Sequence, residues 1–472
     1  MKPTQITPES TVFALLSFEG PDGYSRAGGL ATRVSELAET LAQSGFDTHL
    51  VFVGSPREPG RETRQKGKLT LHRWCQWISK YYPEGVYEGE NEKLYDFNDS
   101  VPWMIKDQIV APAAAEGKVA VVIGEEWHTA EAMCRTSDTL YYHGLRDRAI
   151  LLWNANNVFS FHRLNWGRLN FTTTVTTVSH FMKHIMWSRG IDPIVVPNGI
   201  PARLLRGVDE RRARELRGIF PSDVVFFKLG RWDPDKRWVM AVEAMGRLRA
   251  AGVRPTLIMR GGKEPHEAEV LYVARANGLR VADVAPGGES IEDVIGALAA
   301  ARDADVLNLK FYLPEELVRL IYAGVDGVLA NSGFEPFGLV GLEAMAAGAV
   351  AYTGCTGEEY AVPFENAVVI ETADPGEIAR YAIRLWERPA EAAQIRAAGR
   401  ETAERFAWSH VVSNLATKLE FIGQRSGVLD SEHLRPAAAA VPPDGRRARG
   451  TARRPRGATP ASPQQERTTL AR

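Results

Sequence analysis

One stretch late in the chain constrains the fold more than any other, because it combines a strand, a loop, a helix and a second strand. The apolar run Gly327–Ala330 is typical of a buried strand. A helical pattern begins near Phe337 and ends at Gly348, and the apolar run Ala349–Tyr352 follows at once. This order is the building block of parallel sheets covered by helices, so the sequence predicts an α/β protein.

Two carboxylates flank the start of this predicted helix. Glu335 comes just after the strand, at the sheet edge where ligands bind in parallel sheets. Glu343 lies inside the helix among apolar neighbours, where an unpartnered carboxylate is costly. Gly338 and Gly341 would let ligand oxygens approach the backbone N–H groups and the positive end of the helix dipole. A packed helix with two solvated acids would explain the apolar residues but not this arrangement.

The composition of the whole chain excludes several classes of protein. A length of 472 residues is too great for one core, so we expect at least two domains. The net charge of -1 predicts no bulk attraction to nucleic acid or anionic membrane. Three widely spaced cysteines argue against a disulfide framework or a cysteine-rich zinc site, and no stretch near the N-terminus is long enough for a signal peptide or membrane span. We expect a cytoplasmic protein.

The first half of the chain repeats the strand–loop–helix plan. The strand-like run Thr11–Phe18 leads into a glycine-rich loop with Gly28 and Gly29, and a helical spacing follows over Leu30–Ser44. The loop lacks the G-x-G-x-x-G pattern, which argues against nicotinamide binding. A later strand ends close to His128, which on its own is more often a packed or capping residue than a functional one.

The second half places two cations after a strand, Arg231 and Lys236. Cations beside a bare helix start suit a diphosphate, because charge-assisted bonds stabilise a leaving group as its negative charge develops. Local pairing with Asp233 and Asp235 is the alternative. Carboxylates accept hydrogen bonds from sugar and ribose hydroxyls, so cations and carboxylates around one cleft indicate a nucleotide sugar.

Two other stretches leave their roles open. Residues 55–115 are unusually aromatic, which fits an insertion that covers the domain or a wall that stacks on the sugar rings of an acceptor. From about Gly427 the chain is rich in Ala, Pro and Arg and cannot bury enough apolar surface to fold. We expect disorder there, as a solvated tail or a weak electrostatic tether.

The motifs together resemble a known family. Phe334–Gly348 closely resembles the E-x7-E signature of retaining family-4 and glycogen-synthase-type glycosyltransferases with the GT-B fold. Weaker resemblances cover most of residues 11–423. Arg26–Gly29 is similar to the family's Gly-Gly loop, with Arg26 in place of the usual lysine, and Glu126–Thr129 is similar to its Asp-Trp-His segment, with Glu126 in place of the aspartate. Further similar segments are Ser179–Phe181, Pro197–Ile200 and Gly230–Lys236.

The resemblance implies two Rossmann-like domains that face each other across a cleft. The acceptor-side domain would span residues 1–198 and the nucleotide-sugar-binding domain residues 199–405. The C-terminal helix, residues 406–424, would pack back on the first domain, and residues 425–472 would form the disordered tail.

The resemblance also implies a role for each site residue. Arg231 and Lys236 would hold the donor diphosphate, Glu335 would contact the sugar hydroxyls, and Glu343 would bind the ribose. The implied catalytic residues are His128, Glu335, Arg231 and Lys236. The implied donor-binding residues are Gly28, Gly29, Arg231, Lys236, Glu335, Phe337, Gly338, Leu339 and Glu343.

The sequence therefore predicts transfer of a hexose such as glucose from a nucleoside diphosphate to an acceptor hydroxyl, of a glucan or a small glycoside. The resemblance implies retention of anomeric configuration by front-side attack, with no metal and no cofactor besides the donor substrate. Two alternatives stay open: a phosphorylase or epimerase on the same architecture, and a non-catalytic protein that binds nucleotide sugars.

Overall fold

The computed structural model describes residues 2–288, 290–354 and 357–431. Most of the predicted tail therefore lies outside the described residues. The described part of that segment is packed, because Val428 and Leu429 are buried and the N–H of Asp430 donates to the carbonyl of Pro3. The ordered chain thus continues a few residues beyond the predicted end of the last helix.

Among the described residues, eight strands of the first half form one sheet in the order β3-β4-β2-β1-β5-β6-β7-β8, parallel except for β3. Its strands are β1 Thr11–Leu16, β2 Asp47–Val53, β3 Arg61–Arg64, β4 Leu69–Trp74, β5 Val119–Glu125, β6 Ala149–Ala155, β7 Thr174–Thr177 and β8 Ile194–Val195. The helices are α1 Gly29–Gln43, α2 Gln76–Ser79, α3 Glu90–Met104, α4 Ala111–Ala115, α5 Ala130–Tyr142, α6 Trp166–Thr172 and α7 His180–Trp187.

Seven strands of the second half form a parallel sheet in the order β11-β12-β10-β9-β13-β14-β15, again counting only described residues. Its strands are β9 Val224–Leu229, β10 Pro255–Arg260, β11 Val281–Val284, β12 Val306–Leu309, β13 Gly327–Ala330, β14 Ala351–Gly354 and β15 Val368–Ile370. The helices are α8 Glu210–Gly218, α9 Trp238–Ala250, α10 His266–Ala276, α11 Ile291–Ala300, α12 Glu315–Gly324, α13 Leu339–Ala346, α14 Pro375–Glu387, α15 Pro389–Arg405 and α16 Trp408–Arg425.

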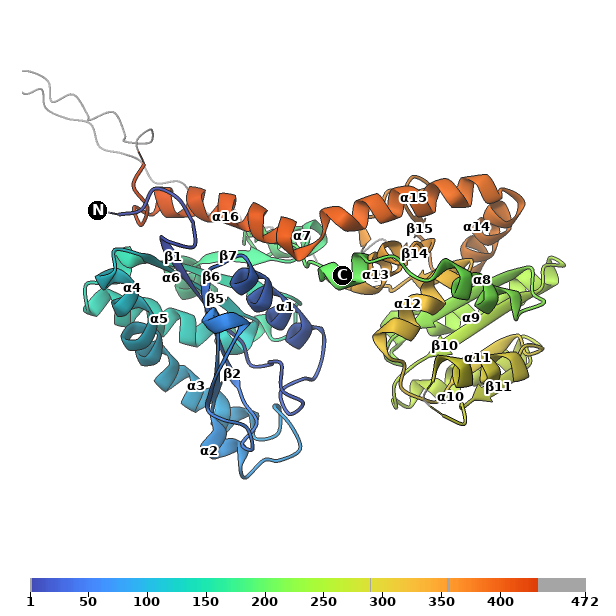
Figure 1. Cartoon of the computed structure of the whole chain (residues 1–472), viewed down its shortest axis with the longest axis horizontal. Coiled ribbons are helices and arrows are strands. Elements are labelled where there is room, and N and C mark those ends of the chain that lie inside the picture. The colour runs from blue at the N-terminus through green and yellow to red at the C-terminus, as the bar shows by residue number, and fades with distance from the viewer. Residues whose placement is uncertain (1, 289, 355–356, 432–472) are drawn as a thin grey trace, which may run out of the picture. The chain divides into compact units, whose positions relative to one another are not determined.

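The central strands are apolar on both faces because helices cover both sides of each sheet (Figure 1). In β1, Phe13 and Leu15 belong to the core that includes α1 and α16, whereas Ala14 and Leu16 belong to the core that includes α3 and α5. Strand β1 lies in register with β5 from Thr11 opposite Val119 onward.

In each sheet, later strands are added first on one side of the first strand and then on its other side. β1 lies between β2 and β5, and β9 lies between β10 and β13. Such a switch leaves a crevice at the carboxyl ends of the two neighbouring strands, which is where ligands bind in open α/β sheets. The loops after β1, β5, β9 and β13 are the ones that carry the residues singled out by the sequence.

The last helix returns to the first sheet (Figure 1). Trp408 and Leu415 of α16 are buried in the same core as Leu37 of α1. The two chain crossings between the sheets pair with each other, because the N–H of Ile200 donates to Phe406 and the N–H of Trp408 donates to Ile200. Gly199 allows this approach, since a Cβ there would lie 2.5 Å from the Trp408 ring.

None of the described helices is both long and apolar enough to cross a membrane. The cytoplasmic location stays a prediction.

Candidate active site

A cavity of about 320 Å³ lies at the carboxyl ends of the strands. Its walls include Gly29 and Arg33 of α1, residues 156–159 after β6 and Asn198 of the chain crossing. From the second sheet come residues of the loop after β9 and residues 334–339 after β13. The cavity therefore collects loops that follow β1, β6, β9 and β13, whereas the loop after β5, which carries His128, does not line it.

The centre of the second-sheet wall is an ion pair. The Lys236 ammonium lies 2.8 Å from a carboxylate oxygen of Glu335, and both side chains are mostly buried. Arg231 is largely exposed, and its guanidinium lies 3.9 Å from Asp233. The local pairing expected as an alternative is therefore only a long contact between Arg231 and Asp233. Lys236 instead pairs with Glu335 on the neighbouring loop.

A second lysine, Lys228, anchors the start of the loop that carries Glu335. Lys228 of β9 is buried, and its ammonium donates to the side-chain oxygen of Asn331 at 2.6 Å and to the carbonyl of Leu329 at 3.1 Å. Burial, with a smaller contribution from the neighbouring charge of Lys236, lowers the pKa of Lys228 to about 7. Lys228 therefore ties the first residue of the motif loop to the sheet.

The glycines at the start of α13 serve packing as well as access. Gly338 adopts a left-handed conformation with φ of 78°, which favours glycine, and its carbonyl accepts a hydrogen bond from the Tyr360 hydroxyl. A Cβ at Gly341 would lie 2.5 Å from the same hydroxyl. The expectation that Gly341 leaves room for a ligand is therefore wrong, because Tyr360 fills that space.

Glu343 has a different environment from Glu335. Its side chain is partly accessible, yet it is surrounded closely enough that burial raises the pKa of its carboxyl to about 7. The negative charge of Glu315 contributes to that rise, and Arg203 opposes it. Glu335, the residue predicted to bind the sugar, therefore forms an ion pair. The carboxyl group of Glu343, the residue predicted to bind the ribose, has a pKa of about 7.

On the first-sheet side, a carboxylate occupies the start of α1. Glu19 accepts hydrogen bonds from the backbone N–H groups of Gly28 at 2.9 Å and Ala31 at 3.1 Å. The Tyr87 hydroxyl donates to the other oxygen of Glu19 at 2.6 Å. Gly29 itself has open space around its Cα, so a ligand can still approach there. Part of the anion-binding capacity of this helix start is already used within the protein.

A buried ion pair lies behind this wall. The Arg33 guanidinium contacts the Glu125 carboxylate at 3.1 Å, and both side chains are almost fully buried. Arg33 also donates to the Asn198 side chain at 2.7 Å, and Asn156 donates to Glu125 at 2.7 Å. The network joins α1, the end of β5, the loop after β6 and the chain crossing, and three of its members line the cavity.

His128 lies deeper than the predicted role requires. Its ring stacks on Phe18 and Trp127, with centroids 4.4 and 3.8 Å away, and its Nε2 lies 2.8 Å from Glu90. Burial lowers the pKa of His128 to about 4, so the ring is neutral at pH 7. Nε2–H then donates to Glu90, and Nδ1 is a buried acceptor with no partner among the described residues.

Contacts between the two halves involve the predicted motif loop. The Ser179 hydroxyl donates to the carbonyl of Pro336, and the rings of Phe181 and Phe334 lie edge to face at 5.5 Å. His180 lies 2.8 Å from Glu359. The segment Ser179–Phe181, which the sequence analysis associated with the family, therefore touches the loop that carries Glu335.

Comparisons with known proteins fit this geometry. The sequence profile of "Glycosyltransferase Family 4" matches residues 27–204, and that of "Glycosyl transferases group 1" matches residues 209–402. Together the two matches cover the loops that line the cavity and every described strand of the two sheets except β1. The chain belongs to the family-4, glycogen-synthase-like glycosyltransferases.

Individual relatives are distant in sequence. Glycogen synthase of Thermus thermophilus is 24% identical over 443 residues, which cover 82% of this chain and 95% of that protein. The Anabaena protein HepE in complex with UDP-glucose has a TM-score of 0.58 at 14% identity, over 87% of this chain and 100% of HepE. The catalytic domain of Arabidopsis thaliana starch synthase IV, bound to ADP and acarbose, has a TM-score of 0.59 at 16% identity, over 89% and 99%. The glycosyltransferase therefore has the GT-B fold.

The structure gathers most of the predicted site residues of this glycosyltransferase in one cavity. Those that line it are Gly29, Arg231, Lys236, Glu335, Phe337, Gly338 and Leu339. Gly28, Glu343 and His128 do not line it. The sequence did not single out Arg33 and Asn156, which line the wall on the first-sheet side, and Asn198 beside them belongs to the similar segment Pro197–Ile200 without a role of its own. Their roles in the reaction remain predictions.

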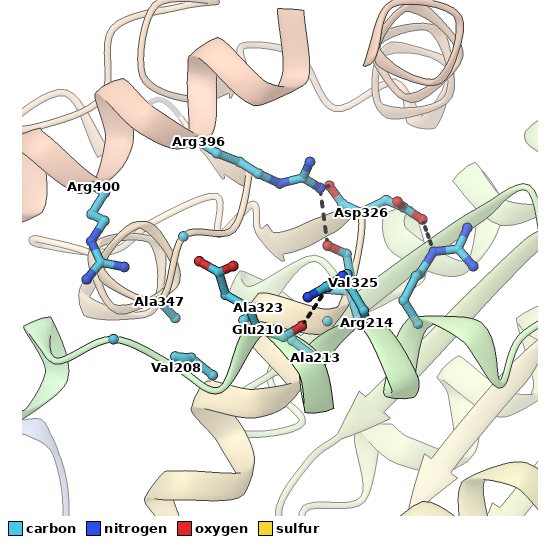
Figure 2. Close-up of a pocket in the computed structure, with 14 residues that line it drawn as sticks. Val208, Glu210, Ala213, Arg214, Ala323, Val325, Asp326, Ala347, Arg396 and Arg400 are labelled. Carbon is cyan, nitrogen blue, oxygen red and sulfur yellow. Dashed lines mark hydrogen bonds and ion pairs between the residues drawn. The ribbon is translucent and has the colours of Figure 1, made fainter. Parts of the chain in front are cut away.

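A larger cavity of about 600 Å³ lies on the other edge of the second sheet, beside residues that precede β13 and β14 (Figure 2). Its arginines are engaged with the protein. Arg396 donates to the carbonyl oxygens of Val325 and Asp326, just after α12, and Arg400 donates to the carbonyl of Leu205. Two helices, α12 and α13, end here with their carbonyl groups and α8 begins here at Glu210, so the helix dipoles do not mark this cavity as an anion site. None of the predicted site residues lines it.

The Arg33–Glu125 pair generates a stability prediction. Arg33→Met leaves a buried carboxylate without its cation and should lower the free energy of unfolding by about 3–5 kcal/mol. The double variant Arg33→Met/Glu125→Gln should be more stable than Arg33→Met alone, because no unpaired charge remains. Chemical denaturation measures both.

Arg203→Met is the matched control, since Arg203 forms ion pairs at a more exposed position and its loss should change the free energy of unfolding by less than about 1 kcal/mol. Equal losses in Arg33→Met and Arg203→Met would contradict a special role for the buried pair.

Proposed function

We propose that this chain is a retaining hexosyltransferase. It transfers a hexose such as glucose from a nucleoside diphosphate to a hydroxyl group of a carbohydrate or small-molecule acceptor, without a metal ion or other cofactor. The observation that carries the proposal is one cavity that combines the Lys236–Glu335 ion pair, Arg231 and the start of α13. HepE and starch synthase IV, which share the fold, were solved with UDP-glucose and with ADP, so they support the ligand class without selecting the base.

The proposed reaction follows from the charges in the cavity. The bond between the anomeric carbon and the diphosphate oxygen breaks, and its electron pair stays on the diphosphate. Arg231 and Lys236 stabilise the charge that develops there. The acceptor oxygen forms the new bond on the same face, and its proton passes to the departing phosphate oxygen. This front-side path balances without a protein base.

The two carboxylates have separate proposed tasks. Glu335 accepts hydrogen bonds from the sugar hydroxyls, and its pairing with Lys236 holds it in place before the donor arrives. Glu343 binds the ribose. The backbone from Phe337 to Leu339 lies against the sugar and the phosphates, where the start of α13 favours negative charge.

The first-sheet side completes the proposed site. Gly28 and Gly29 let the donor phosphates approach the start of α1. His128 contacts the transferred sugar near its reacting carbon through Nδ1, its unpartnered nitrogen. Reaching that nitrogen requires a rearrangement of its surroundings, because His128 is 5% exposed.

A non-catalytic protein that binds nucleotide sugars is the second candidate. It is favoured by one observation: Glu19 accepts a hydrogen bond from the Gly28 amide, so that amide is not free for the proposed donor phosphates. Turnover measurements separate the two candidates, because a binding protein takes up the donor without releasing nucleoside diphosphate.

Lys236→Met tests the proposed chemistry. Removing this cation should lower kcat by about 10²–10³-fold, because the charge on the departing diphosphate loses a fixed partner. The measurement is nucleoside diphosphate release with UDP-, ADP- and GDP-glucose and a panel of carbohydrate acceptors. Arg254→Met, at an exposed pair at the opposite edge of the sheet, should retain full activity. Wild-type kcat in Lys236→Met would contradict the assignment.

Donor affinity should depend on pH through Glu343. The ionised carboxylate accepts hydrogen bonds from both ribose hydroxyls, and its pKa is raised to about 7. Affinity should therefore fall as pH drops below 7, approaching about tenfold per pH unit, and level off above it. Calorimetric titration with an intact sugar nucleotide measures this between about pH 6 and pH 8, where its doubly esterified diphosphate does not titrate. Glu343→Gln should remove the pH dependence, and a slope that persists in this variant would assign it to another group.

A further inference from the structure

An aromatic groove outside the donor cavity runs along α3. It has a volume of about 620 Å³ and lies between α3 and the segment that contains α2. Three aromatic side chains on its walls are well exposed: Trp77 at 61%, Tyr81 at 77% and Tyr95 at 75%. Soluble proteins rarely gather exposed rings in one hollow without a partner for them.

The polar residues of this groove fit hydroxyl-rich ligands. Asn91, Tyr95 and Asp99 follow one another at intervals of four along α3, and Glu92 and Asp96 form a parallel row. Carboxylates and an amide oxygen accept hydrogen bonds from hydroxyl groups, while ring faces pack on the C–H surfaces of sugars. The same carboxylates repel nucleic acid phosphates and anionic lipids, which leaves a neutral carbohydrate as the occupant whose chemistry matches both features.

The groove is built rigidly rather than left as a loose insertion. Lys93 of α3 is fully buried, and its ammonium donates to the carbonyls of Gly85 at 3.0 Å and Val86 at 3.2 Å, and to the Tyr24 hydroxyl at 2.6 Å. These bonds hold the loop after α2 against α3. A binding surface fixed in this way loses little conformational entropy when a ligand docks.

Contacts connect the groove with the donor cavity. Asn91, on the groove, follows Glu90, whose carboxylate contacts His128 after β5. The loop held by Lys93 carries Tyr87, which donates to Glu19 at the start of α1, next to Gly29 in the cavity wall. The groove and the cavity wall are therefore joined through α3 and the loop that precedes it.

We propose that this groove binds a neutral oligosaccharide chain and holds it while the end of the chain reacts in the cavity. The inference rests on the proposed glycosyl transfer for its purpose, but the binding itself is measurable without turnover. It names an extended carbohydrate, rather than a small glycoside, as the acceptor.

Binding is tested by native gel electrophoresis with glycogen in the gel, and by calorimetry with maltoheptaose and with soluble cello-oligosaccharides as a β-linked comparison. Tyr81→Ala and Tyr95→Ala should each weaken carbohydrate binding roughly threefold to tenfold, the range expected for loss of one aromatic contact. Phe171→Ala is the matched control, because Phe171 is 90% exposed on α6 of the same sheet unit and does not line the groove. Absence of carbohydrate binding, or equal binding in all variants, would overturn the inference.

Kinetics separate this inference from the proposed function. With a long acceptor, Tyr81→Ala and Tyr95→Ala should raise the acceptor KM roughly threefold to tenfold and leave the donor KM and kcat unchanged. With a monosaccharide acceptor they should match the wild type.

If the protein transfers sugar but these variants change neither carbohydrate binding nor the acceptor KM, the proposed role of the groove is overturned and the proposed function stands. Loss of carbohydrate binding in variants of a protein that shows no transfer supports the groove and overturns the proposed function. A change of oligomeric state in the variants, with carbohydrate binding intact, assigns the rings to a protein contact and also overturns the inference.

Discussion

The buried ion pair between Arg33 and Glu125 fixes the geometry on which the site depends. A charge taken out of water must find partners within the protein, and here the further partners of the pair come from two other segments, the chain crossing and the loop after β6. Through Asn198 the pair reaches the chain crossing between the two sheets, and through Asn156 it shapes the cavity wall. The crossing itself is hydrogen-bonded to the start of α16 through Ile200, which holds it in place at the edge of the cavity.

The two glutamates of the family motif, Glu335 and Glu343, lie near the same helix start but in different electrostatic environments. Glu335 lies before α13 and is neutralised by Lys236. Glu343 lies eight residues further on, where burial and Glu315 raise the pKa of its carboxyl. A carboxyl group with a pKa near 7 that binds a ligand in its ionised form couples ligand binding to proton release. The difference in environment supports different tasks for the two side chains.

Local sequence patterns predicted the fold and the loops of the site, because strand–loop–helix units require apolar runs and glycines at fixed places. They could not predict partners that are distant in the chain. Arg33 lies in a helix with ordinary apolar spacing, and only the fold brings it to Asn198, 165 residues away. Gly341 was interpreted as space for a ligand, yet that space belongs to Tyr360. Glu19 was not singled out, although its carboxylate caps the start of α1.

The central claim is that this glycosyltransferase moves a sugar from a nucleotide to an acceptor and keeps its anomeric configuration. Proton NMR of the first product formed from UDP-, ADP- or GDP-glucose tests that claim most directly, because the anomeric signal reports the configuration before any equilibration. The account predicts a new glycosidic bond with the configuration of the donor. An inverted anomer, or no transfer and no donor hydrolysis with any of these donors, would contradict it.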